Sequence, residues 1–531
     1  KGSLDIDTRI ESAGKSELES QGSIKLKLDE LTLNNQPRKN IKDISADVDY
    51  DISINLKSDS IRVRQADMKI QDIALSLSGD IINIKSSPEI VLAVVIPDTK
   101  LADLQNSLKP FADVKELDLS GMITADLKVS GKTNEINSIN TDGTITLKNT
   151  GIVYQNVNAT LDGDLKLKKQ SVNINLIGTV DKNTAEIKGN ISNYLKNQKI
   201  NLNIYSKQLF LDELIPARAE KNKVSPEKSG TATGNADAEP VNLKLTAKGE
   251  VKIDSARYKG MTMSNFIMTY VFSNNKLEIT KMTADAGKGN FSLNSIVDLS
   301  KRGYTYSLSA DINSLHADEI INSMFPKAKD TVFGVITSNL KLKGAGTLPD
   351  NIKKNLDGNF DFDIKDGKIT NVPIARNLSQ LLNIKELETL NIKQGNGTVI
   401  IKNGIAKLNS ILSSDDIIMD PKGNIGLNGD LDLAFDLKMS PNLTGNAMSS
   451  KVSQFIKNDE GWGIIPIKCP GTFAKPGCIP DPVKAGKQVI KKKTKELIDD
   501  LLNRDKNKKE GEAPQHKSDD PIDNLIKGIF N

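Results

Sequence analysis

The sequence predicts an elongated, mostly β protein: a long antiparallel meander of strands with one aliphatic face. Three observations support this fold class. Apolar and polar residues alternate along most of the chain, a set of motifs recurs about every 107 residues, and aromatic side chains are scarce. The chain has 531 residues, of which 37% are hydrophobic and 4% aromatic. A chain of this length exceeds what one hydrophobic core supports, so several domains or a repeat architecture is expected.

Alternation with a period of two residues is the dominant pattern, and it indicates half-buried strands. From Ser23 to Leu28, isoleucine and leucine alternate with lysine, which puts the aliphatic side chains on one face. Asp-Gly and Asn-Gly pairs recur between such runs, and they favour two-residue hairpin loops because both central residues take positive φ. We therefore expect hairpin turns at the pairs that begin at Asp142, Asp162, Asp357, Asp366, Asn403 and Asn428.

Three short helical segments resemble one another and mark an internal repeat. They cover residues 98–111, 208–216 and 314–326, and each ends at or beside a proline. Glycines in the strands that follow repeat with the same spacing. Gly143 and Gly249 lie 106 residues apart, and Gly249 and Gly358 lie 109 apart. Agreement between independent features indicates a repeat architecture.

The repeat sets the expected division of the chain. It predicts an N-terminal β segment at 1–97, repeats at 98–211 and 212–317, a C-terminal β region at 318–480, and a helical tail at 481–531. An insertion at 217–240 is rich in Lys, Glu, Ser, Gly, Ala and Pro, so we expect a disordered surface loop. The tail combines amphipathic helical stretches with a charged stretch that is expected to be disordered.

Charge and targeting signals exclude some classes of protein. The chain has 72 basic and 68 acidic residues, mixed along the strands. A nucleic-acid partner would need a basic stripe, and there is none. The run from Ile90 to Ile96 is the longest clean apolar stretch, too short for the roughly 20 residues that cross a bilayer. Because Lys1 begins neither a signal peptide nor a chain with an initiating Met, we expect a mature or truncated form without its targeting segment.

Two cysteines, Cys469 and Cys478, are separated by a loop that contains Pro and Gly. In an oxidising compartment, this spacing favours a local disulfide. Unpaired thiols and a metal site are the alternatives. A metal site would need more ligands, and the two histidines, His316 and His516, lie elsewhere in the sequence.

No catalytic constellation is present: the sequence has no G-x-S-x-G, phosphate-binding loop or HExxH motif, so neither an enzyme nor a cofactor is expected. The candidate site is the aliphatic face. Its side chains could form the ordinary core of a sandwich or solenoid, or they could line a groove that holds an apolar ligand. The sequence shows no obvious second layer, and exposed apolar surface of that extent normally marks a binding site. The candidate residues are Ile123, Leu127, Val129, Ile145, Leu147, Val251, Ile253, Ile336, Leu340, Leu342, Phe360, Phe362 and Ile364.

The order of several glycine-containing strand motifs resembles the AsmA-like family of diderm bacteria. The likeness covers most of residues 100 to 490, and each single motif is loose, so the specificity comes from their order. The motifs lie at 249–260, 282–291, 356–369, 423–431 and 465–476.

The resemblance implies a taco-shaped, repeating β-groove. It implies a periplasmic protein that is anchored in the inner membrane by an N-terminal helix, which this chain lacks, and that conducts phospholipids toward the outer membrane without catalysis. The alternative is an assembly factor that binds outer-membrane β-barrel proteins or other envelope proteins through an exposed sheet edge. An enzyme or a glycan binder is disfavoured by the shortage of Trp, Tyr and His.

Overall fold

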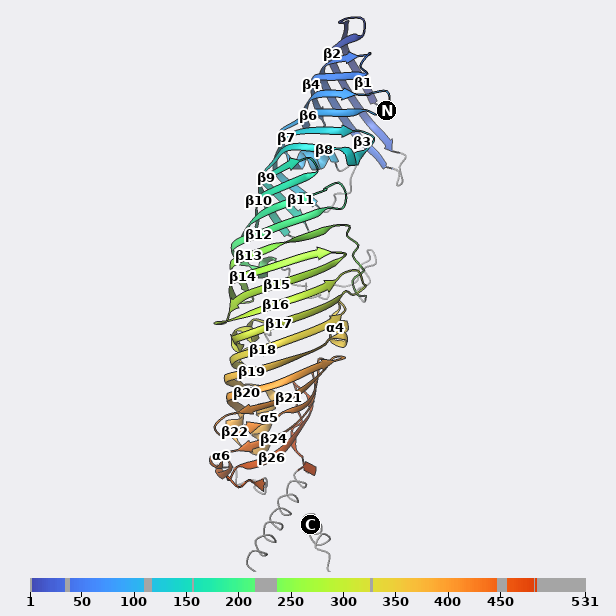
Figure 1. The fold of residues 1–531 in the computed structure, drawn as a ribbon. Helices are drawn as coiled ribbons and strands as arrows, with labels where there is room; N and C mark the ends of the chain where they lie inside the picture. Colours follow the sequence, from blue (N-terminus) through green and yellow to red (C-terminus); the bar gives the residue numbers. More distant parts are fainter. Residues whose placement is uncertain are drawn as a thin grey trace, which may run out of the picture.

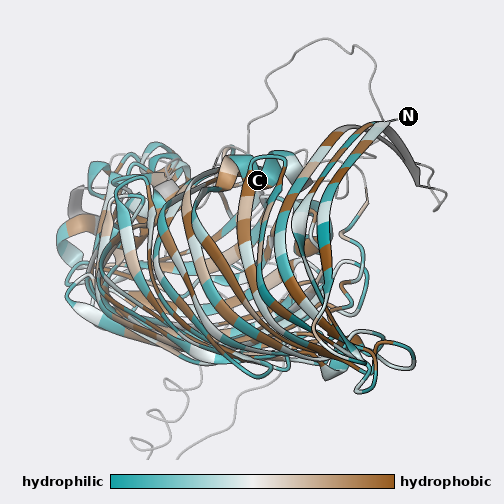
Figure 2. Ribbon diagram, turned by 90° about the horizontal axis from the view of Figure 1, so that it is seen from above, coloured by the Kyte–Doolittle hydropathy of each residue, from teal (hydrophilic) through white to brown (hydrophobic). Residues whose placement is uncertain are grey.

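The computed structural model describes residues 2–33, 39–108, 117–154, 157–214, 236–324, 328–446, 456–481 and 483–484. All strands in these ranges belong to one sheet of 27 strands, stacked from the N-terminal to the C-terminal end of an elongated molecule (Figure 1). The predicted fold class is confirmed. Seen along the long axis, the strands curve so that the sheet is trough-shaped in cross-section (Figure 2).

Short helices divide the sheet into four units. The first contains β1 (Gly2–Ser12), β2 (Glu17–Leu33), β3 (Lys39–Asn55), β4 (Ser60–Ile70), β5 (Ile73–Ile82), β6 (Glu89–Lys100) and α1 (Leu101–Leu108). The second contains β7 (Leu117–Lys132), η1 (Ile136–Ser138), β8 (Asn140–Tyr154), β9 (Val157–Lys168), β10 (Ser171–Val180), β11 (Asn183–Ser192), β12 (Lys199–Phe210) and α2 (Leu211–Leu214).

The third unit contains β13 (Thr246–Tyr258), β14 (Met261–Ser273), β15 (Lys276–Ala286), β16 (Gly289–Asp298), β17 (Thr305–His316) and α3 (Ala317–Met324). The fourth begins with β18 (Val332–Ala345), α4 (Pro349–Asn355), β19 (Asp357–Thr370), α5 (Pro373–Leu382), η3 (Lys385–Glu388) and β20 (Thr389–Lys402). It ends with β21 (Ile405–Ser413), β22 (Ile417–Met419), β23 (Lys422–Gly426), β24 (Asp430–Met439), α6 (Pro441–Asn446), β25 (Ile456–Lys457), β26 (Gly463–Thr472) and β27 (Ile479–Pro480).

The three expected helical segments are α1, α2 and α3, and each directly follows the last strand of its unit. Because β6, β12, β17 and β19 run in the same direction, the helices that follow them share one long edge of the sheet, which we call the helix rim. The opposite edge, which carries η1 and α4, is the tip rim.

Glycines that allow a close approach of two strands occur at the corresponding strand of each unit, including the N-terminal one. A Cβ added to Gly143, Gly249 or Gly358 would lie only 2.0, 1.8 or 2.2 Å from a carbonyl oxygen of the preceding strand. Gly22 on β2 makes the same close approach, at 2.2 Å from the oxygen of Asp7. Glycines at which another backbone comes this close mark bends in strands. The same close approach therefore recurs in all four units.

Most of the predicted hairpin turns are wrong. Only the pairs at Asn403 and Asn428 lie between strands, whereas those at Asp142, Asp162 and Asp366 lie within strands and Asp357 opens β19. The glycines after Asp142 and Asp162 serve close strand approach instead. Many of the actual turns use other residues, such as Asn274 and Asn275, which both have positive φ between β14 and β15.

From β1 to β21 the sheet departs from a pure antiparallel meander at one place, and beyond β21 non-consecutive strands also pair, such as β21 with β23 and β24 with β26. β12 and β13 pair in parallel, with Ile200 opposite Ala247. Among its described residues, the third unit therefore has no counterpart of the first strand that β1, β7 and β18 supply in the others. The predicted insertion falls largely outside the described residues, but its last part, 236–240, is ordered by hydrogen bonds, so the prediction of disorder is wrong there.

Residues 236–245 form what we call the strap, which follows the tip rim from the start of α4 back to β12. Asp237 accepts hydrogen bonds from the backbone N–H groups of Thr347 (2.7 Å) and Leu348 (3.2 Å) and from the side-chain amide of Asn351 (2.7 Å). Further along, the strap is held by hydrogen bonds to the turns of the tip rim: it accepts one from the N–H of Gly303 and donates to the backbone oxygen of Leu299 and the side-chain oxygen of Asn275. The N–H of Thr246, the first residue of β13, donates to the backbone oxygen of Gln198. The Thr347 N–H contributes most to lowering the pKa of Asp237, partly offset by desolvation.

Candidate functional site: the aliphatic floor

The aliphatic side chains of successive strands form one continuous surface, which we call the floor. Residues directly opposite each other in neighbouring strands point to the same face of a sheet. Leu127 on β7 lies opposite Val94 on β6 and Gly143 on β8, and Gly143 lies opposite Leu167 on β9. This correspondence continues through each pair of neighbours, so the floor runs along the whole sheet.

The candidate residues of β7 and β8 lie side by side on the floor. Ile123 is directly opposite Leu147, and Ile145 is opposite Ala125. Val129 follows Leu127 at the next inward position of β7. These five candidate side chains are all half-buried, whereas Asp126 and Lys128 on the other face are exposed. The floor is therefore the more sheltered face of the curved sheet. The five residues are Ile123, Leu127, Val129, Ile145 and Leu147.

The candidates of β18 and β19 form a second such patch in the fourth unit. Ile336 lies opposite Ile364, and Leu340 lies opposite Phe360. Leu342 faces Gly358, and Phe362 faces Ser338. The rings of Phe360 and Phe362 lie 6.4 Å apart between centroids, and all six candidates are half-buried.

The β13 candidates, Val251 and Ile253, lie on the floor beside the parallel seam, opposite Ile204 and Ser206 of β12. Ile253 is only 5% exposed, because it belongs to a core cluster against which residues of α2 and α3 pack. Val251 packs against this cluster and is half-buried. The floor thus alternates between half-open stretches and places where a rim helix closes over it.

Tyrosines on the floor lie opposite glycines in three places. The pairs are Tyr50 with Gly22, Tyr270 with Gly249, and Tyr306 with Gly344. The Tyr50 hydroxyl is hydrogen-bonded to Ser20 and Thr8, and these bonds lower its pKa. Other tyrosine hydroxyls on the floor are less well satisfied.

Tyr270 donates to the oxygen of Leu202 at 3.1 Å, and burial raises its pKa. The Tyr306 hydroxyl is buried without a partner among the described residues, and burial raises its pKa as well. The Tyr306 hydroxyl is therefore an isolated polar group in an otherwise apolar part of the floor.

The C-terminal end of the floor is closed. Leu378 and Leu382 of α5 and Leu387 of η3 are 2%, 1% and 0% exposed, and they belong to the same buried cluster as floor residues of β24 and β26. We call α5 and η3 the plug. The expectation that the floor has no covering layer is therefore wrong at this end. The sequence does carry a signal for the plug, because apolar residues recur at helical spacing from Ile374 to Leu382.

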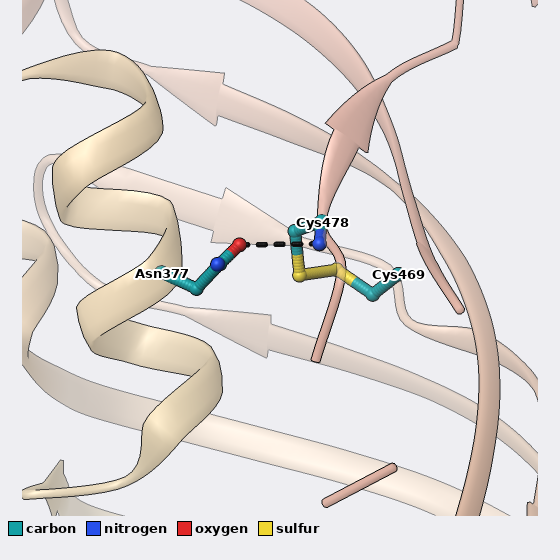
Figure 3. The surroundings of a disulfide bond; sticks show 3 residues. All are labelled: Asn377, Cys469 and Cys478. Atoms are coloured by element: carbon teal, nitrogen blue, oxygen red, sulfur yellow. Dashed lines mark hydrogen bonds between the residues drawn. A yellow bond between two sulfur atoms is a disulfide. The ribbon is translucent and has the colours of Figure 1, made fainter. Parts of the chain in front are cut away.

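A disulfide joins Cys469 and Cys478 beside the plug (Figure 3). Cys469 is fully buried in the cluster, opposite Leu433 of β24. The backbone N–H of Cys478 donates to the side-chain oxygen of Asn377 on α5 at 3.1 Å. Among the three alternatives for the cysteines, the structure contains the disulfide.

The outer face is polar and carries exposed ion pairs. Arg64 contacts Glu19 at 2.6 Å and Asp51 at 2.9 Å, and Arg62 contacts Asp80 at 2.9 Å. Exposed pairs of this kind contribute little to stability. Their charged groups make the outer face of the sheet hydrophilic. In the described part of the chain, no three His, Cys, Asp or Glu side chains are arranged to hold a metal ion. None of the helices within the described ranges has the length and apolar character needed to cross a membrane.

The continuous floor in a trough-shaped sheet of repeated units defines an elongated β-groove protein. The chain belongs to the AsmA family, whose model matches residues 94–411, more than half of the sequence. The resemblance seen in the sequence motifs is thereby confirmed. No curated protein and no solved structure matches the chain. Membership of the AsmA family supports, in broad terms, a role in lipid or protein assembly of the envelope, and the family is generally non-enzymatic.

Proposed function

We propose that the protein is a non-enzymatic lipid-transfer bridge. Acyl chains of phospholipids lie on the floor, their head groups stay in water along the rims, and the lipids move between the inner and the outer membrane. The single observation that carries this proposal is the continuous floor, which has aliphatic side chains on every strand of the first two units, exposed on β1 and mostly half-buried from β2 to β12. Half-exposed apolar surface of this extent is unfavourable in water unless a ligand covers it.

The proposal includes a periplasmic location and an inner-membrane anchor that precedes the chain. It is supported by membership of the AsmA family and by a disulfide, which is typical of oxidising compartments. Phospholipids and the two membranes are the proposed partners, and nucleic acid is not among them.

The test places a carboxylate on either face of one strand. Leu340 points to the floor and is half-buried, whereas its neighbour Lys341 points outward and is exposed. Leu340→Glu puts a charge among acyl chains, where it loses its hydration, and Lys341→Glu makes the larger charge change in water. Phospholipid recovered from purified protein, and the rate of lipid transfer between vesicles, should fall strongly in Leu340→Glu alone.

Leu127→Glu and Lys128→Glu repeat the comparison in the second unit, with Leu127 on the floor and Lys128 outside. Circular dichroism confirms that each variant keeps its sheet. Equal transfer by floor and outer-face variants would contradict the proposal. A lipid-free wild-type protein that binds an outer-membrane barrel protein in stoichiometric amounts would favour the assembly-factor alternative.

A further inference from the structure

The floor does not end where the plug begins, because the strands beneath the plug continue it. Leu408 of β21 lies opposite Val399 of β20 and Gly423 of β23, and Gly423 lies opposite Leu433 of β24. Leu433 in turn lies opposite Cys469 of β26. The same face that is half-open on β7 and β8 therefore extends to the last strands of the sheet.

Over β24 and β26 this face is fully occupied by the protein's own side chains. Leu437 and Ile467 are 0% and 1% exposed, and Leu378, Leu382 and Leu387 of the plug belong to the same cluster. Interiors of this kind are close-packed, with few voids larger than a water molecule. An acyl chain has no free surface to occupy there.

The plug is also fastened from the C-terminal side. The disulfide ties the loop after β26 to the floor through Cys469, and Cys478 bonds to Asn377 on α5. The αL residue Asn383 ends α5, and the chain then turns into η3, so that Leu387 lies in the same cluster as Leu382. Two attachments hold α5 in place: the hydrogen bond from Asn377 to the loop that the disulfide closes, and the packing of Leu378 and Leu382 in the buried cluster.

We infer that the groove is blind at its C-terminal end, and that its cargo crosses a rim upstream of α5 instead of leaving along the axis. The inference rests on the proposed lipid-bridge function. The plug is a fixed stop: it limits the lipid-holding floor to the strands before β24 and directs acyl chains sideways toward the partner membrane.

Photo-leucine labelling of the whole chain tests the inference. The diazirine analogue replaces leucine with little change in volume, so the packed plug is preserved. The labelled protein is incubated with vesicles of phosphatidylethanolamine and phosphatidylglycerol, irradiated, and digested, and lipid adducts are assigned to peptides by mass spectrometry. We expect adducts at Leu127 and Leu340, and at least tenfold fewer at Leu433 and Leu437.

Adducts of equal yield at Leu437 and Leu127 would overturn the blind groove and leave the lipid bridge standing. Absence of adducts at Leu127 and Leu340 would instead overturn the proposed function, and the blind groove with it. The two failures are therefore distinguishable in one experiment.

A matched pair of variants checks that the plug itself keeps lipid away. Leu382→Asp puts a charge in the buried contact, and Lys385→Asp puts it on an exposed position of η3. In a folded Leu382→Asp protein, adducts should appear at Leu437, whereas Lys385→Asp should keep the wild-type pattern. An unchanged pattern in folded Leu382→Asp would overturn the role of α5 as a stop. If this variant does not fold, the wild-type pattern decides the inference.

Discussion

Removing one leucine from the plug should loosen the C-terminal end of the sheet far more than removing one from the open floor. Leu382 of α5 is 1% exposed and belongs to the same buried cluster as residues of the last strands, so Leu382→Ala leaves a cavity. Substitutions of this kind cost about 2–5 kcal/mol. Leu127 is half-buried, so Leu127→Ala loses only part of its transfer free energy, on the order of 1 kcal/mol.

Hydrogen exchange followed by mass spectrometry resolves the two effects, because repeat proteins open in local units. A loss of about 3 kcal/mol accelerates exchange about a hundredfold wherever exchange reports local opening. Peptides that cover α5 should show this acceleration in Leu382→Ala, and β7 should stay unchanged. Leu127→Ala should accelerate β7 less than tenfold. Equal acceleration at both sites would refute the view that the plug is packed and the floor is open.

Three further outcomes follow from close contacts elsewhere in the sheet. Gly249→Ala should destabilise the parallel seam, because its Cβ would lie 1.8 Å from a carbonyl oxygen. At Gly178 the nearest atom to an added Cβ is the end of the Ile187 side chain at 3.2 Å, so Gly178→Ala is the milder control in a thermal melt. Asp237→Ala should release the strap, seen as faster proteolysis of 236–245. Because the pKa of Asp237 is lowered on folding, its contribution to stability is fully present above the ordinary value of 3.8 and is lost as the pH falls from there through the lowered pKa. Replacing Cys469 and Cys478 by Ser should cost about 2–4 kcal/mol, measured as faster exchange in α5.

The sequence predicts which side chains share one face of the sheet, because the face to which a strand residue points is a local property. Alternation fixes which side chains share a face whatever the neighbouring strand is, so Leu127 and Leu340 could be placed without knowing the pairing. The helices α1, α2 and α3 were also predictable, since each has a short amphipathic pattern that ends near a proline.

The hairpin turns were less predictable, because Asp-Gly is ambiguous. At Gly143, the absence of a side chain serves the close approach of Asp126 on the neighbouring strand, with a φ of +141° inside β8. A turn needs glycine because the backbone takes positive φ there. A close approach of two strands needs glycine because a side chain would collide with the neighbouring backbone. The sequence does not distinguish the two, because the difference lies in a neighbouring strand that is distant along the chain.

The plug was missed for a related reason. The helical spacing from Ile374 to Leu382 indicates an amphipathic helix, but not which surface the helix covers. That choice depends on the path of the chain after β19 and on Asn377 meeting Cys478, 101 residues later. The disulfide, in contrast, needed only nine residues of separation and was foreseen as one of three options.

The third unit shows which property of the sheet is kept when its pattern changes. The described part of this unit has no counterpart of the first strand, and β13 pairs with β12 in parallel. Two features nevertheless persist: Val251 still lies opposite an aliphatic residue, Ile204, and Gly249 still makes its close approach, now to Leu202 of β12. The relative direction of the two strands therefore changes at this seam, whereas the facing of the aliphatic residues and the close approach at the glycine are maintained. A core would require only that these residues be buried. A conduit requires that the floor be unbroken from unit to unit, and the parallel seam meets this stricter condition.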